Sequence, residues 1–230
     1  MIEHVYRRAA EARGVSRVLV ATDDDRIASA VEAFGGEAVM TSRAHHTGTD
    51  RIAEVAAGLE CDVIINVQGD EPLIAPEMIE QALGPFAADP ALQMTSLRTA
   101  LTSFEALIDP NVVKVVVDLE DFALYFSRAP IPWVRDREPG SDPAPQAWRH
   151  IGLYGYRRTF LARYAALAPT RLEQLERLEQ LRALEHGIKI KVMATNHEAV
   201  GVDTPADLAR VEALLVSAAS DRSETRAHSG

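Results

Sequence analysis

Apolar and polar residues alternate along the first ninety positions in blocks that predict a regular succession of strands and helices. Short apolar runs typical of buried strands are separated by longer segments with apolar residues at helical spacing. We expect strands at 16–24, 37–42 and 62–67, and helices at 1–13, 25–36, 49–60 and 76–86. Strands joined by helices of this length form a parallel sheet covered on both faces, so the pattern predicts an α/β fold.

The pattern changes after about residue 92, where strands follow one another with few helices between them. These strands are expected at 94–100, 112–118, 123–128 and 150–156, and they suggest an antiparallel or mixed extension of the sheet. A long helix is then predicted at 170–187, a strand at 188–195 and a closing helix at 204–219. We therefore expect one domain at 1–216 with a lobe at 93–160, followed by a disordered tail at 217–230.

Composition narrows the class of protein. Apolar residues make up 47% of the chain, and the net charge is −10. The acidic balance argues against a protein that coats nucleic acid, because no general positive field is present. Cys61 is the only cysteine, and no run of the sequence approaches a membrane span or a signal core. We expect a cytoplasmic protein that binds neither nucleic acid nor a membrane.

Two aspartates are the first candidates for chemistry. Asp70 follows the most apolar strand in INVQGDEP, and Asp203 lies in GVDTPADL. Each could equally be a turn residue or a helix cap. If the two carboxylates met, they would repel by about 4 kcal/mol at 4 Å and an effective dielectric of about 20, so a cation or a raised pKa would be needed. Carboxylate oxygens with positions left for phosphate suit Mg²⁺.

Three further motifs offer polar groups for a ligand. Thr47, Gly48 and Thr49 begin a predicted helix, a place that attracts polar or anionic groups. YFSRAPIPW holds an arginine, Arg128, in a rigid turn that suits carboxylate recognition, although a surface arginine is about as common there. RHIGLYGY places polar rings on one strand face, where they could cover a sugar or be ordinary half-buried aromatics.

Together these motifs resemble a known enzyme family. ATDD, TGTDR, NVQGDEP, NVVKVV, ALYFSRAPIPW, RHIGLYGYR, LEQLR and GVDTPADL occur in the order typical of the 3-deoxy-manno-octulosonate cytidylyltransferases. The resemblance runs from residue 1 to about residue 215. It implies a Rossmann-like nucleotidyltransferase with a mixed, mostly parallel sheet and a small β-rich dimerisation extension. The implied reaction is Mg²⁺-dependent transfer of the cytidylyl group of CTP to 3-deoxy-D-manno-octulosonate (Kdo) for lipopolysaccharide biosynthesis, carried out by a homodimer.

The resemblance also implies roles for individual residues. Asp70 and Asp203 would be the catalytic pair that binds the metal. The cytidine side of the site would comprise Thr22, Asp23, Thr47, Gly48 and Gln68. The Kdo pocket would comprise Arg128, His150, Tyr154, Glu179 and Gln180.

One part of the family pattern is missing from the printed sequence. Members normally begin with a strand and a basic loop resembling IPARYxSxRLPGKPL, which cradles the triphosphate, whereas this chain opens at MIEHV. We expect either that the natural start lies upstream of Met1 or that the chain is a shortened form with little activity. Two alternatives stay open: a cytidylyltransferase for another acidic sugar, and a non-catalytic dimeric nucleotide-binding relative. A dinucleotide-dependent oxidoreductase is disfavoured because no GxGxxG follows a first strand.

Overall fold

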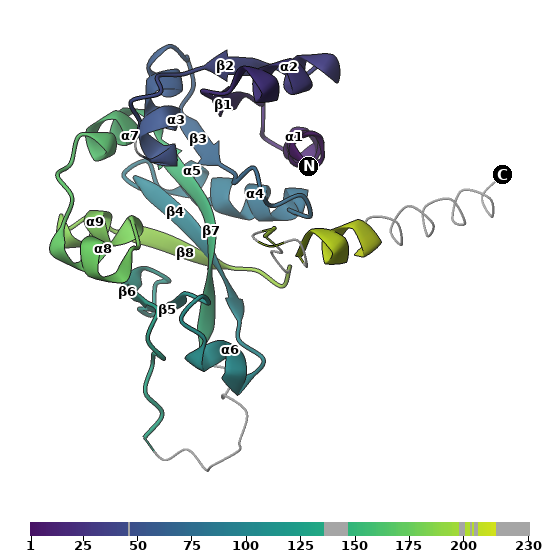
Figure 1. Ribbon diagram of the computed structural model, residues 1–230. Helices are drawn as coiled ribbons and strands as arrows, with labels where there is room; N and C mark the ends of the chain where they lie inside the picture. The colour runs from purple at the N-terminus through teal and green to yellow at the C-terminus, as the bar shows by residue number, and fades with distance from the viewer. Residues whose placement is uncertain (46, 136–146, 198–200, 203, 205–206, 215–230) are drawn as a thin grey trace.

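The computed structural model describes residues 1–45, 47–135, 147–197, 201–202, 204 and 207–214, which form two sheets with helices packed on them (Figure 1). In chain order the helices and strands are α1 (Ile2–Glu11), β1 (Val20–Thr22), α2 (Asp25–Ala33), β2 (Ala38–Met40), α3 (Gly48–Ala57), β3 (Val63–Asn66), α4 (Pro76–Leu83), α5 (Pro85–Ala88), β4 (Met94–Ala100), α6 (Phe104–Ile108), β5 (Lys114–Val117), β6 (Ala123–Ser127), β7 (Trp148–Arg157), α7 (Arg158–Ala165), α8 (Arg171–Glu176), α9 (Gln180–Glu185) and β8 (Ile190–Ala194). Residues 207–214 are helical, within the closing helix that the sequence predicts.

Strand β7 is the centre of the larger sheet. It pairs antiparallel with β4 on one side, and with β3 and β5 along the other. Strand β4 in turn pairs parallel with β8, so β3, β4 and β8 run in one direction. The register places Tyr154 of β7 between Asn66 of β3 and Ser96 of β4. The tip of β3 is therefore fixed against the middle of the longest strand.

Helices pack on both faces of this sheet, as the α/β pattern predicts. On one face, Tyr156 of β7 shares a buried cluster with Leu161 of α7 and Leu181 of α9. On the other face, Leu153 packs with Val5 of α1 and Met78 of α4. Residues of β7 alternate between the two clusters because successive side chains of a strand point to opposite faces. The expected α/β fold with a mixed sheet is confirmed. The expectation that the sheet is mostly parallel is wrong for the described strands, because β7 runs antiparallel to β3, β4 and β5, and β4–β8 is the parallel pair of the larger sheet.

The two-stranded sheet lies apart from the larger one. Strands β1 and β2 pair in parallel, and α2 packs beside them at the top of Figure 1. Asp24 caps α2 by accepting a hydrogen bond from the Arg26 amide. A side chain of α3 connects this unit to the rest of the molecule: Arg51 lies 3.0 Å from Asp23 and also bonds to Thr41.

Residues 93–160 supply β4, α6, β5, β6 and β7, and the far ends of these elements project from the body (Figure 1). Leu101, Leu107 and Ala147 form a small buried cluster there. The division of 1–216 into a body and a lobe stays a prediction. The predicted tail at 217–230 lies outside the described residues.

The prediction of one long helix at 170–187 is wrong. The segment forms two six-residue helices, α8 and α9, separated at Arg177, which has left-handed backbone angles of φ 54° and ψ 47°. The carboxylate of Glu176 explains the break, because it accepts hydrogen bonds from the Ser127 hydroxyl at 2.6 Å and the Arg128 amide at 2.9 Å. These contacts tie the last residue of α8 to the end of β6, immediately before the left-handed residue at which the helix ends.

Candidate active site

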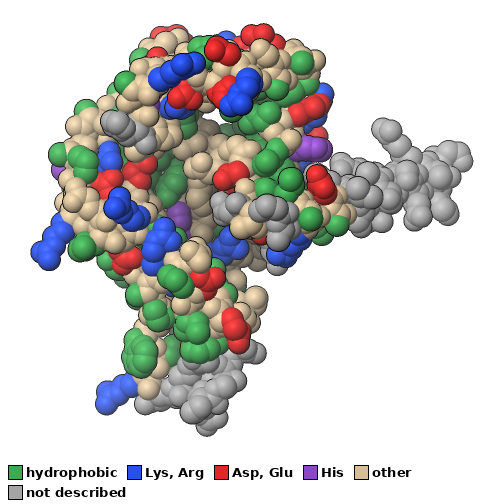
Figure 2. All heavy atoms as spheres, viewed as in Figure 1, with side chains coloured by type: hydrophobic (Ala, Val, Ile, Leu, Met, Phe, Trp, Pro, Cys, Tyr) green, Lys and Arg blue, Asp and Glu red, His purple; other side chains and the backbone are tan. Residues whose placement is uncertain are grey.

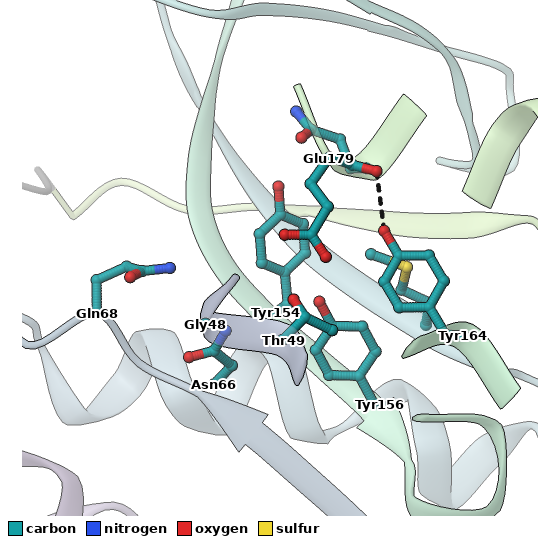
Figure 3. A pocket seen from close by; sticks show the side chains of 10 residues that line it. Gly48, Thr49, Asn66, Gln68, Tyr154, Tyr156, Tyr164 and Glu179 are labelled. Carbon is teal, nitrogen blue, oxygen red and sulfur yellow. Dashed lines mark hydrogen bonds between the residues drawn. The ribbon is translucent and has the colours of Figure 1, made fainter. Parts of the chain in front are cut away.

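A cavity of about 100 Å³ lies beside β7, at the end of β3. Figure 2 shows the same face of the molecule hollowed between α3 and the α8–α9 segment. The lining residues come from the start of α3, the end of β3, β4, β7, α7 and the start of α9 (Figure 3). They are Gly48, Thr49, Asn66, Gln68, Met94, Tyr154, Tyr156, Tyr164, Glu179 and Gln180.

Three tyrosines form one wall of this cavity. Tyr154 and Tyr156 lie on the same face of β7, two residues apart, and their ring centroids are 6.0 Å apart. The ring of Tyr164 in α7 stacks on that of Tyr156, with the two centroids 5.9 Å apart. Burial raises the pKa of Tyr154, Tyr156 and Tyr164 above the ordinary value. The phenols therefore stay neutral and present hydroxyl groups that both donate and accept hydrogen bonds.

Glu179 provides the acidic group of the cavity. Burial raises the pKa of its carboxyl, while a hydrogen bond with Thr49 and the charge of Arg182 oppose that rise. Its Oε1 atom is buried without a hydrogen-bond partner, although almost all buried polar atoms have one. The hydroxyl of Tyr164 donates to the Glu179 carbonyl at 2.9 Å (Figure 3). The side chain is thus an acceptor left for a ligand that donates hydrogen bonds.

Two residues expected in the sugar pocket lie outside this lining. His150 is buried next to it, with its ring 5.5 Å from Tyr154 and its Nε2 atom 2.9 Å from the Ser96 hydroxyl. Arg128 donates from Nε to the Glu176 carbonyl and from Nη1 to the Pro110 carbonyl. Both roles in sugar binding stay predictions.

The residues expected on the cytidine side divide into two groups. Gly48 and Gln68 line the cavity, and Thr47 caps α3 by accepting a hydrogen bond from the Asp50 amide at 3.1 Å. Thr22 and Asp23 lie at the end of β1 in the smaller sheet. Arg51 brings Asp23 to the first turns of α3, so the two groups are joined through one guanidinium.

Asp70 lies in the turn that follows β3, and its side chain is exposed. The Val202 amide donates to the Asp70 carbonyl at 2.9 Å, which joins two segments that are far apart in the sequence. Asp203 lies outside the described residues. Among the residues that the structure describes, no group of three or more His, Cys, Asp or Glu side chains is placed to hold a metal ion. No described helix is long and apolar enough to cross a bilayer.

The cavity also contains residues to which the resemblance gives no role: Thr49, Asn66, Met94, Tyr156 and Tyr164, of which Thr49 and Tyr156 belong to motifs that the sequence singles out. Asn66 could have been predicted as a site residue, because it is the polar residue at the end of the apolar strand β3. Tyr156 repeats the position of Tyr154 two residues along β7. Tyr164 gave no such signal, because TFLARYAAL matches an ordinary amphipathic helix.

A second hollow of about 490 Å³ lies elsewhere, between α4–α5 and β8. It is lined by apolar and mixed residues, including Leu92, Phe122 and Met193. None of the residues assigned to the site from the sequence lines this second hollow. Size alone therefore does not identify the site, and the smaller cavity with its convergent polar groups is the better candidate.

Comparison with known proteins assigns the class first. Residues 1–190 match the family model described as Cytidylyltransferase. The structure of 4-diphosphocytidyl-2C-methyl-D-erythritol synthase from Anaerococcus prevotii shares the fold, with a TM-score of 0.58 at 11% identity over 93% of this chain and 88% of that one. The fold and the family model together define a nucleotidyltransferase of the cytidylyltransferase class.

Nearer relatives narrow the family. The chain is 54% identical over 217 residues to the 3-deoxy-manno-octulosonate cytidylyltransferase of Geotalea uraniireducens, covering 92% of this chain and 86% of that protein. The protein of the same name from Geobacter sulfurreducens is also 54% identical, with 92% and 87% covered. A structure of CMP:2-keto-3-deoxy-manno-octonic acid synthetase complexed with CTP is 46% identical, with a TM-score of 0.87 and 94% and 87% covered. The chain belongs to the 3-deoxy-manno-octulosonate cytidylyltransferase family, which confirms the resemblance in its motifs.

Proposed function

We propose that the protein transfers the cytidylyl group of CTP to Kdo, giving CMP-Kdo and pyrophosphate for lipopolysaccharide biosynthesis. The observation that carries the proposal is the 54% identity, over 92% of the chain, to proteins named for this transfer. The polar cavity beside β7 supports it, because tyrosine hydroxyls and a carboxylate suit a polyhydroxylated ligand.

The size of the cavity divides the site between the two substrates. About 100 Å³ is small beside the roughly 300–1,000 Å³ of pockets that enclose a whole drug-sized ligand. The cavity is therefore suited to the hydroxyl-bearing part of a sugar, with Glu179 accepting from a hydroxyl and the tyrosines bonding to its neighbours. CTP would lie at the mouth of the cavity, where Gln68 and the start of α3 line it and Asp70 is exposed beside them.

The reaction needs little covalent chemistry from the protein. The anomeric hydroxyl oxygen attacks the α-phosphorus in line, forming one P–O bond as the bond to the β-phosphate bridging oxygen breaks. Pyrophosphate leaves with the electron pair, and the hydroxyl proton passes to solvent. Catalysis then depends on holding the two reactants in contact and on offsetting the phosphate charge.

Asp70 and Asp203 would hold a divalent cation of the magnesium type. Carboxylate oxygens are the ligands that Mg²⁺ prefers, and the Val202–Asp70 hydrogen bond brings the segment before Asp203 to the end of β3. When bound, Mg²⁺ would neutralise charge on the triphosphate and orient it. The residues of the chain would position this charge at the mouth of the cavity.

A second copy of the chain is the proposed partner, in the cytoplasm. Strand β6 is an edge strand of the larger sheet, and its Leu124 is 62% exposed. Trp133 is 81% exposed a few residues along the chain, and Ile108 of α6 is 50% exposed. Large exposed apolar side chains on and near an edge strand favour association. Light scattering on the wild type and Leu124→Arg tests this, with a monomeric wild type contradicting it.

The assay for the proposed reaction is release of pyrophosphate from CTP and Mg²⁺ with a panel of sugar acids. We expect release with Kdo, and loss of at least 99% of the rate in Asp70→Asn and in Asp203→Asn. Glu60→Gln, which alters an exposed carboxylate away from the site, serves as the control. Turnover preferring another acidic sugar would favour that alternative, and CTP binding without turnover would favour the non-catalytic one.

A further inference from the structure

A buried ion pair that does not line the cavity holds the segment that carries Glu179 and Gln180. Arg182 of α9 donates from Nη2 to Oε1 of Glu173 at 2.5 Å and from Nε to Oε2 at 2.9 Å. The two side chains are only 7% and 13% exposed. This bidentate geometry fixes α9 against α8 across the left-handed residue Arg177.

Each member of the ion pair makes further contacts: Glu173 with the start of α8, and Arg182 with Tyr164 and Glu179, which line the cavity. Glu173 also accepts from the Thr170 amide at 3.0 Å, which ties the pair to the start of α8. The guanidinium of Arg182 lies over the ring of Tyr164, 5.9 Å from its centroid. Tyr164 in turn donates to the Glu179 carbonyl, which also accepts from the Arg182 amide at 3.0 Å. The backbone of Glu179 is therefore held by both members of a stacked pair.

Packing alone does not explain why two charged residues, Glu173 and Arg182, are buried between α8 and α9. Burying two charged groups is costly, and an apolar pair of similar volume often stabilises a fold as well or better. An ion pair does provide a single geometry, because a planar guanidinium bonds to a carboxylate in a fixed orientation. Helices of six residues have little stability of their own, so their orientation depends on such fixed contacts.

We propose that the Glu173–Arg182 ion pair, stacked on Tyr164, is a positioning device that sets Glu179 and Gln180 for the sugar acid and leaves CTP binding to other parts of the site. The inference rests on the proposed function. Three features carry it: the bidentate ion pair, the stacking of Arg182 on Tyr164, and the two hydrogen bonds to the Glu179 carbonyl. None of these groups is assigned to CTP, whose expected contacts lie on α3, β1 and the turn after β3.

Steady-state kinetics of Arg182→Met separate this role from a general loss of structure. We expect the KM for Kdo to rise at least tenfold and the KM for CTP to change less than twofold. The KM for Kdo of Arg182→Lys should lie between those of the wild type and Arg182→Met. Lysine keeps the positive charge but cannot form the bidentate hydrogen bonds or stack on the Tyr164 ring. Glu173→Gln keeps the shape of the side chain that Arg182 contacts but removes its charge. It should also raise the KM for Kdo, by less than Arg182→Met does.

Arg157→Met is the matched control for loss of a stacked arginine. Arg157 lies over the Phe86 ring at 5.2 Å and donates to the carbonyls of Phe86, Asp89 and Leu92, away from the cavity. We expect it to lower the melting temperature while leaving the KM for Kdo within twofold. If Arg182→Met does not fold, Arg182→Lys and Glu173→Gln carry the same comparison.

The outcomes for the two proposals are distinct. A wild-type protein that releases no pyrophosphate with any sugar acid contradicts the proposed function. A wild type that turns over, with an Arg182 variant whose KM for Kdo is unchanged or whose two KM values rise together, contradicts only the positioning role. Calorimetric titration with the sugar acid repeats the comparison without turnover.

Discussion

His150 should make the protein sensitive to mild acid. Its side chain is buried among apolar and aromatic groups, with the Phe126 ring 4.9 Å away. Burial, with a smaller effect from the Arg149 charge, lowers the pKa of His150 from 6.5 to about 3. The imidazole is therefore neutral in the folded protein, whereas the same ring in the unfolded chain gains a proton below pH 6.5.

The sign and size of the effect follow from that difference. Because the unfolded state binds the extra proton, folding stability falls as the pH drops below 6.5 and is fully present above it. At pH 5.5, one unit below the unfolded value, the loss is about 1.4 kcal/mol, since each unit corresponds to about 1.36 kcal/mol. The figure is almost independent of the folded pKa, provided that this lies well below 5.

Urea unfolding of the wild type and His150→Gln, at pH 8 and pH 5.5, measures this contribution. A glutamine can still bond to the Ser96 hydroxyl but does not gain a proton. Between the two pH values, the wild type should lose about 1.4 kcal/mol more than the variant. Carboxylates that titrate in both proteins cancel in the comparison. His4→Gln, at an exposed position of α1, is the control and should lose as much as the wild type. Equal losses in the wild type and His150→Gln would refute the reasoning.

Two further substitutions test how the fold holds the site. Lys114→Met should lower the free energy of unfolding, measured by urea titration, by about 2–5 kcal/mol. The buried Lys114 ammonium donates to three backbone carbonyls, which the substitution would leave unpaired; a loss below about 1 kcal/mol would contradict this. Gly155→Ala would place a Cβ atom 2.7 Å from the Phe86 ring, so the melting temperature should fall by several degrees, corresponding to about 1–3 kcal/mol of overpacking; an unchanged melting temperature would contradict it.

The sequence was most informative where local pattern and tertiary packing agree. The apolar run that becomes β3 and the alternating residues of β7 were predicted because both strands are set by burial on the two faces of the sheet. Helix starts were also predictable, since Thr47 caps α3 through the contact that its residue type favours. The motifs then identified the family, although periodicity alone would have left the function open.

The break between α8 and α9 shows what such patterns cannot contain. Leucine, glutamate, glutamine and arginine all favour helix, so local propensity supports one continuous helix. The break depends on Glu176 meeting the end of β6, a contact between segments that are far apart in the sequence. The burial of leucines also changes at the break, because Leu178 and Leu181 are buried while Leu175 of α8 is 69% exposed.

The site depends on that same break. In a continuous helix, Glu179 and Gln180 would follow the direction of α8, which the Glu176 contacts fix against β6. The left-handed residue Arg177 turns the chain, and the Glu173–Arg182 pair then holds α9 so that Glu179 meets Thr49 at the start of α3. A backbone conformation that costs energy in any non-glycine residue is thus kept beside the cavity. The position that local helix propensity predicts worst is therefore the one that turns the chain toward the Glu179 side of the cavity.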